Sequence, residues 1–143
     1  MKFLTAFTAF LLTAHAAQAQ KNTSIEGTWT GTSICLLRNS PCHDEQVVYR
    51  ITRIGADSAG ITPLRVTMTK IVNGKEEDMA DLAPCAFTHS TASLHCPMPP
   101  TVRAGDWSFT AAGDKLDGGL WIRGGTKFRD IHVKRVVTTP PQR

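Results

Sequence analysis

The chain has 143 residues, of which 41% are hydrophobic, and its formal net charge is +4. This length suits one domain with its own core, and the weak positive charge argues against a nucleic-acid partner bound through a strong basic field. No apolar run reaches the roughly 18 residues that a membrane-spanning helix needs, so we expect no membrane span.

The first 19 residues have the pattern of a secretory signal peptide. Lys2 supplies a positive start, an apolar run follows from Phe3 to Thr13, and Ala17-Gln18-Ala19 fits a cleavage site. A single mature domain then spans residues 20–137, and the polar tail 138–143, with its two prolines, is expected to be disordered. The predicted location is the periplasm or the outside of the cell.

The mature sequence reads as an all-β domain. Short β-rich runs alternate with turn residues, and no stretch keeps apolar residues at helical spacing over three turns. Asn73-Gly74 is a strong hairpin signal, and the mostly charged strand after it is expected at an edge or facing solvent. The expected strands are 27–35, 46–54, 64–72, 75–82, 85–89, 92–96, 107–111, 115–122 and 126–136. Together they predict an antiparallel meander.

Four cysteines follow the leader, an even set that predicts two disulfides in an oxidising compartment. If 85–89 and 92–96 pair around Ser90-Thr91, Phe87 lies opposite Leu94 and Cys85 lies opposite Cys96, within bonding distance. The remaining pair, Cys35 and Cys42, flanks a short loop. The spacings match no common zinc framework, so we expect no metal site.

Cys42-His43-Asp44-Glu45 is the densest run of functional groups in the chain. Consecutive residues of a strand point to opposite faces, so the run does not converge on one substrate atom. We interpret it as a solvated or turn-stabilising loop, with a calcium or catalytic site as the alternative. No Gly-x-Ser-x-Gly elbow is present, and we expect neither an enzyme nor a cofactor.

Gly27-Thr28-Trp29, at the start of the first expected strand, resembles the Gly-x-Trp signature of lipocalins and related calycin barrels. In that family the tryptophan closes one end of an up-and-down barrel, and an arginine from a late strand packs over its indole. The resemblance implies a small lipocalin-like barrel in which Arg135 or Arg129 covers Trp29. The rest of the chain is similar to small secreted bacterial proteins of undefined function.

Two functions are compatible with such a barrel. The first is an exported, monomeric binding protein that holds a small apolar or amphipathic ligand, with walls supplied by Tyr49, Trp107, Phe109 and Trp121. The alternative is a module that binds another exported protein, such as a protease inhibitor that inserts the segment Lys21 to Ile25 into a protease cleft. An aromatic-lined cavity of about 300 Å³ or more would favour the first function, and a packed interior would favour the second.

Overall fold

The computed structural model describes residues 24–99, 104–122 and 124–137. The predicted signal peptide and the predicted tail 138–143 lie outside these residues. The described part is built almost entirely of β-structure, as the alternating sequence pattern predicts.

The described residues contain eight strands and one short 3₁₀ helix, in sequence order. They are β1 (Gly27–Cys35), β2 (Glu45–Arg53), β3 (Ile61–Val72), β4 (Lys75–Thr88), the helix η1 (His89–Thr91), β5 (Ser93–Pro97), β6 (Ala104–Ala112), β7 (Lys115–Ile122) and β8 (Thr126–Arg135).

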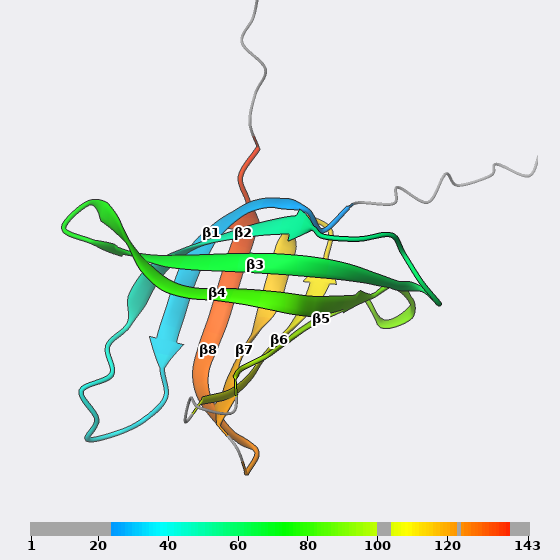
Figure 1. Cartoon of the computed structure of the whole chain (residues 1–143). Helices are drawn as coiled ribbons and strands as arrows, with labels where there is room; N and C mark the ends of the chain where they lie inside the picture. Colours follow the sequence, from blue (N-terminus) through cyan, green and yellow to red (C-terminus); the bar gives the residue numbers. More distant parts are fainter. Residues whose placement is uncertain (1–23, 100–103, 123, 138–143) are drawn as a thin grey trace, which may run out of the picture.

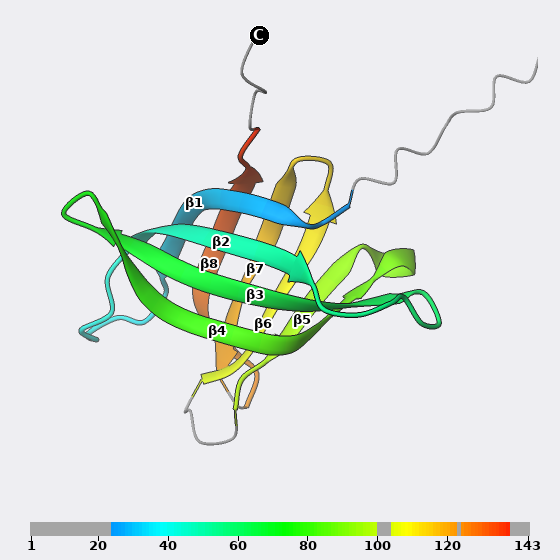
Figure 2. The same cartoon turned by 45° about the horizontal axis from the view of Figure 1, so that its top comes forward.

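The strands form a closed antiparallel barrel in the order β1 to β8 (Figure 1). Each strand pairs with the next in sequence, and β1 also pairs with β8, from Trp29 opposite Arg135 to Cys35 opposite Arg129. Closure therefore gives the first and last strands a partner on each side, which removes the exposed sheet edges that favour aggregation. In both views β2 to β4 cross over β6 to β8 (Figure 2). The predicted meander is confirmed.

Strand β4 is longer than expected, because the predicted strands 75–82 and 85–89 are one continuous strand. Its first part pairs with β3, whereas its printed pairs with β5 begin only at Ala86. In the described residues, the charged stretch 75–82 thus has a ladder partner on one side, as expected of an edge segment.

The hairpin between β4 and β5 has the predicted register, with Phe87 opposite Leu94. Its turn differs from the expected two-residue turn: η1 occupies His89–Thr91, and Ala92 has a left-handed φ of 49°. The register is unchanged because the longer connection removes the same number of residues from each strand. Cys85 and Cys96 are bonded with their Cα atoms 4.3 Å apart, and Cys35 is bonded to Cys42, so both predicted disulfides are confirmed.

The barrel interior holds the hydrophobic core. Inward positions from every strand contribute to one cluster of buried side chains, and its largest fully buried members include Trp29, Tyr49, Ile51, Leu64 and Met68. On β8, Ile131 and Val133 point inward, with Arg129 and Arg135 at the two ends of the same face. The two arginines therefore belong to opposite ends of the barrel.

Candidate functional site

Three of the four aromatic residues predicted to bind a ligand lie together in the core. Tyr49, Trp107 and Phe109 are all buried, and the rings of Tyr49 and Phe109 meet edge to face with centroids 6.0 Å apart. Trp121 is not with them, because it pairs with Lys127 on the outer face of the barrel, where the Lys127 ammonium lies 5.2 Å from its ring centre. The predicted four-residue wall is therefore divided between the two faces of the sheet.

Two polar atoms in this core lack hydrogen-bond partners within the described part of the chain. They are the Tyr49 hydroxyl and the indole nitrogen of Trp107. Burial raises the pKa of Tyr49, and the nearby Glu45 carboxylate adds to this, while the Arg129 cation opposes it. The hydroxyl therefore stays protonated and can donate a hydrogen bond inside the barrel.

One end of the barrel is closed around Trp29. The Arg135 guanidinium lies 4.3 Å from the centre of its ring, and the indole N–H donates to the carbonyl of Ile25 at 3.0 Å. Arg135 also donates to the backbone carbonyls of Ser24 and Glu26. Ile25 is buried, so this end of the segment proposed for a protease cleft is packed against the barrel.

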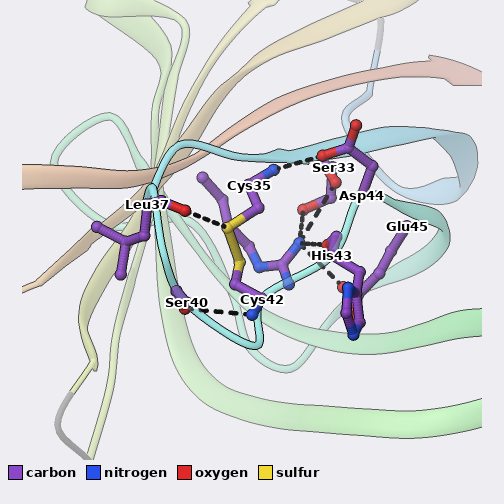
Figure 3. The surroundings of a disulfide bond; sticks show 9 residues. Ser33, Cys35, Leu37, Ser40, Cys42, His43, Asp44 and Glu45 are labelled. Atoms are coloured by element: carbon purple, nitrogen blue, oxygen red, sulfur yellow. Dashed lines mark hydrogen bonds and ion pairs between the residues drawn. A yellow bond between two sulfur atoms is a disulfide. The ribbon is translucent and has the colours of Figure 1, made fainter.

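The Cys35–Cys42 disulfide constrains the loop between β1 and β2 (Figure 3). The Asp44 carboxylate accepts a hydrogen bond from the Cys35 backbone N–H at 2.9 Å, and the Ser40 hydroxyl accepts one from the Cys42 N–H at 3.2 Å. These contacts give Asp44 the turn-stabilising role expected of the loop, and the side chains of the run do not converge on one point.

At the barrel end opposite Trp29, Arg129 links the loop between β1 and β2 to strand β8. One of its nitrogens lies 3.1 Å from the Glu45 carboxylate and also donates to the carbonyl of His43 and the hydroxyl of Ser33, each at 3.1 Å. Arg129 and Glu45 are mostly buried, with side-chain exposures of 12% and 20%. A mostly buried charge is tolerated only when it is paired, so we assign this cluster to closing the barrel end.

An open groove of about 500 Å³ lies on the outer wall formed by β5 to β8. Side chains alternate between the two faces along each strand, which explains the lining of the groove. The sequence neighbours of the buried residues Leu94, Phe109 and Leu116 point outward.

The groove has three rows of residues that run across the four strands. Cross-strand pairing places Ser93, Thr110, Asp117 and His132 in the first row. The middle row is His95, Ser108, Gly119 and Asp130, and the last row is Pro97, Asp106, Trp121 and Lys127. Small residues, Ser108 and Gly119, hold the centre of the middle row, while longer side chains stand on both sides. This size difference forms the groove.

Gly119 cannot carry a side chain at this position. A Cβ atom there would lie 2.2 Å from the carbonyl oxygen of Arg129 and 2.5 Å from the Lys127 side chain. The close approach of β8 therefore requires glycine, and the Lys127 side chain extends over this position.

A connected ionic network of β7 and β8 residues extends from the first row of the groove to the last row. His132 faces the Asp117 carboxylate with Nδ1 at 2.6 Å and the Asp130 carboxylate with Nε2 at 3.1 Å, and Lys127 also contacts Asp130. The hydrogen bond to Asp117, followed by that to Asp130, raises the pKa of His132. Lys127, with a smaller contribution from His132, lowers the pKa of Asp130. Because the imidazolium donates from both ring nitrogens, it is not a free base, and the arrangement suits binding better than proton abstraction.

A second hollow, of about 220 Å³, lies where the β2–β3 loop meets the start of the described chain. There the Thr62 hydroxyl donates to Asp57 at 2.7 Å and accepts from His89 Nε2 at 2.8 Å, and Arg53 pairs with Asp57. These groups are one another's hydrogen-bond and ion-pair partners, so we assign the cluster a structural role.

No group of three or more His, Cys, Asp and Glu side chains is placed to hold a metal ion within residues 24–99, 104–122 and 124–137.

The groove is not among the sites predicted from the sequence. Its alternating pattern places residues such as Ser108 and His132 outside, but the rows depend on three separate strand registers. One of these contains a β-bulge at Leu120/Trp121 that no local motif announces.

Comparisons of the chain with protein-family models, curated proteins and solved structures find no match. In the described part of the chain, no helix has the length and apolar character needed to cross a membrane. The eight-stranded antiparallel barrel is compatible with a lipocalin-like fold.

Proposed function

We propose that this protein is an exported binding protein whose ligand lies in the groove on the outer wall of β5 to β8. The observation that carries this proposal is the three-row arrangement, in which Ser108 and Gly119, the small residues at the centre of the middle row, lie between Trp121 on one side and Asp117 and His132 on the other. The two disulfides suit an oxidising compartment outside the cytosol. A lipocalin-like ancestry for the barrel is part of the same proposal and rests on the Gly27-Thr28-Trp29 motif.

The position of the groove distinguishes this protein from a barrel that encloses its ligand. The core side chains pack against one another around Tyr49 and Phe109, whereas the groove is open to solvent and lined by polar groups. An amphipathic ligand fits such a surface, because the indole of Trp121 offers an apolar body and the neighbouring residues offer hydrogen bonds.

Protein-observed amide spectra during a fragment screen test the proposal. We expect bound fragments to shift amide signals in β5 to β8, and we expect Ser108→Tyr to abolish these shifts, because a tyrosine at this outward position fills the groove. Thr67→Tyr, on the outer wall at β3, is the matched control and should leave the shifts intact. Hits that bind equally well to the Ser108→Tyr variant would show that the groove is not the site.

A second candidate is a small polar ligand inside the barrel. The unpartnered hydroxyl of Tyr49 and indole nitrogen of Trp107 favour it, because buried polar groups usually have partners. In the same screen, this candidate predicts shifts centred on the amides of Tyr49 and Trp107 that survive Ser108→Tyr.

A further inference from the structure

The polar groups of the outer groove restrict the chemical class of its ligand. Along the three rows, hydroxyl groups of Ser93, Ser108 and Thr110 stand beside carboxylates, imidazoles and one ammonium group. An apolar ligand would remove water from these groups without replacing the lost hydrogen bonds, which is costly. The ligand must therefore carry many donors and acceptors of its own.

Charge pairing within the groove favours a neutral ligand. Asp117 and Asp130 share His132, Asp130 also contacts Lys127, and Asp106 lies 3.6 Å from the ring of His95. Asp117 and Asp130 thus have basic partners on the protein, and Asp106 lies beside an imidazole, so these groups present neither a cluster of unpaired carboxylates to a polycation nor an unpaired cation to the phosphates of a nucleic acid.

Trp121 supplies the apolar element of the groove. It follows Gly119 by two positions on β7, so it shares the outer face, and it stands in the row opposite to Asp117 and His132. Sugar rings combine an apolar face of C–H groups with hydroxyls around the rim, and each hydroxyl can donate and accept. This combination matches one aromatic side chain facing a line of mixed donors and acceptors.

We propose that the outer groove binds a chain of neutral sugars, with one sugar ring against Trp121 and the hydroxyls of this ring and the next on Ser108 and the Asp117–His132 pair. Trp121 and Asp117 are four residues apart on β7, or about 13 Å, which is more than one sugar ring spans. The inference rests on the proposed function, since it names the ligand class of the same groove.

The test is a titration of the full mature protein, followed by amide spectra. The probes are neutral oligosaccharides built from glucose, galactose, mannose, xylose or N-acetylglucosamine, with decanoate and spermidine as an anionic and a cationic comparator. We expect at least one oligosaccharide to shift the amides of β5 to β8, and Trp121→Leu and Asp117→Asn each to weaken its binding about tenfold or more.

Two control variants have similar chemistry elsewhere on the outer wall. Thr67→Tyr on β3 and Asp81→Asn on β4 should leave saccharide binding unchanged. Well-dispersed amide spectra of each variant establish that it is folded, so weaker binding then reports on the groove itself.

The outcomes separate the two proposals. If decanoate or spermidine shifts the groove amides and no oligosaccharide does, the groove is a binding site but the saccharide assignment is wrong. If a saccharide shifts only residues outside β5 to β8, the saccharide assignment is likewise wrong. If no probe or fragment shifts the amides of β5 to β8, both proposals are overturned.

Discussion

Trp29 and Arg135 close one end of the barrel together, but their contributions to stability differ. Trp29 is fully buried, so Trp29→Ala should leave a cavity and cost about 3–5 kcal/mol of unfolding free energy. Arg135→Met should cost less, since a cation over a ring contributes about 0.5–2 kcal/mol and the methionine keeps part of the apolar stem over the indole. Urea unfolding of both variants measures the difference, and equal stability of the parent and Trp29→Ala would contradict the buried position of the indole.

His132 makes the groove sensitive to pH. Its folded-state pKa is raised by the hydrogen bonds to Asp117 and Asp130, so its contribution to stability is complete below the unfolded-state pKa of about 6.5 and is lost as pH rises through the folded-state pKa. We therefore expect His132→Gln to reduce the urea midpoint more below about pH 6 than above about pH 8.

Titration of the His132 ring by NMR checks the cause of this shift. The pKa of His132 in the parent should lie above the ordinary value for histidine, and Asp117→Asn should bring it down, because the strongest hydrogen-bonded partner then loses its charge. His43→Gln, at an exposed histidine on the disulfide loop, is the control for removing a surface imidazole. A His132→Gln effect of the same size at both pH values would contradict the network.

At the scale of strands and loops, the two disulfides should differ in their importance. Both close short loops, with sequence separations of 7 and 11, for which chain entropy gives each about 2–3 kcal/mol. Cys85 and Cys96 are buried within the core, whereas Cys35 and Cys42 are partly exposed. Replacing Cys85 and Cys96 together by alanine should therefore cost more than the same change at Cys35 and Cys42. Urea unfolding under non-reducing conditions measures both, and the reverse order would contradict the core position of the Cys85–Cys96 bond.

The same elements show what the sequence could predict. The register of the β4–β5 hairpin was predictable because it follows from a local turn around Ser90-Thr91, and it places Cys85 opposite Cys96, even though the turn itself has a different form. The all-β class and the turn at Asn73-Gly74 are equally local.

The groove was not predictable, because its rows depend on pairings between strands that no short motif determines. Trp121 illustrates the difficulty. Alternation along β7 places it on the outer face, but the bulge at Leu120/Trp121 brings Lys127 opposite it, and no local motif predicts that pairing. A shift of one residue in the pairing of β5 with β6, β6 with β7 or β7 with β8 would separate the residues that form each row.

For the molecule as a whole, the proposed binding groove lies apart from the core and from the two barrel ends. Arg135 and Arg129 close the two ends of the barrel, and the core fills the space between them. The outer wall of β5 to β8 is therefore available for binding without opening the barrel. The rigid wall would hold the groove in its binding geometry, which reduces the entropy cost of association.

Closure of the whole barrel depends on Gly31, at the seam between β1 and β8. A Cβ atom at this position would lie 2.0 Å from the carbonyl oxygen of His132 and 2.8 Å from the Cα atom of Val133. Both are backbone atoms, so no side chain can rotate away, and Gly31→Ala must push the two strands apart. We expect a loss of about 1–3 kcal/mol or more in unfolding free energy, together with faster amide exchange along β8.

Gly55→Ala is the matched control for the seam. A Cβ atom there would lie 3.1 Å from the Pro63 side chain, in the loop between β2 and β3, where a small adjustment relieves the contact. It should leave both the unfolding free energy and the exchange rates of β8 close to those of the parent. If Gly31→Ala behaves in the same way, then β1 and β8 are not paired as closely as described, and the barrel is open at its first and last strands. The outer groove would then border an unpaired edge at β8, so this measurement bears directly on the rigidity of the proposed binding wall.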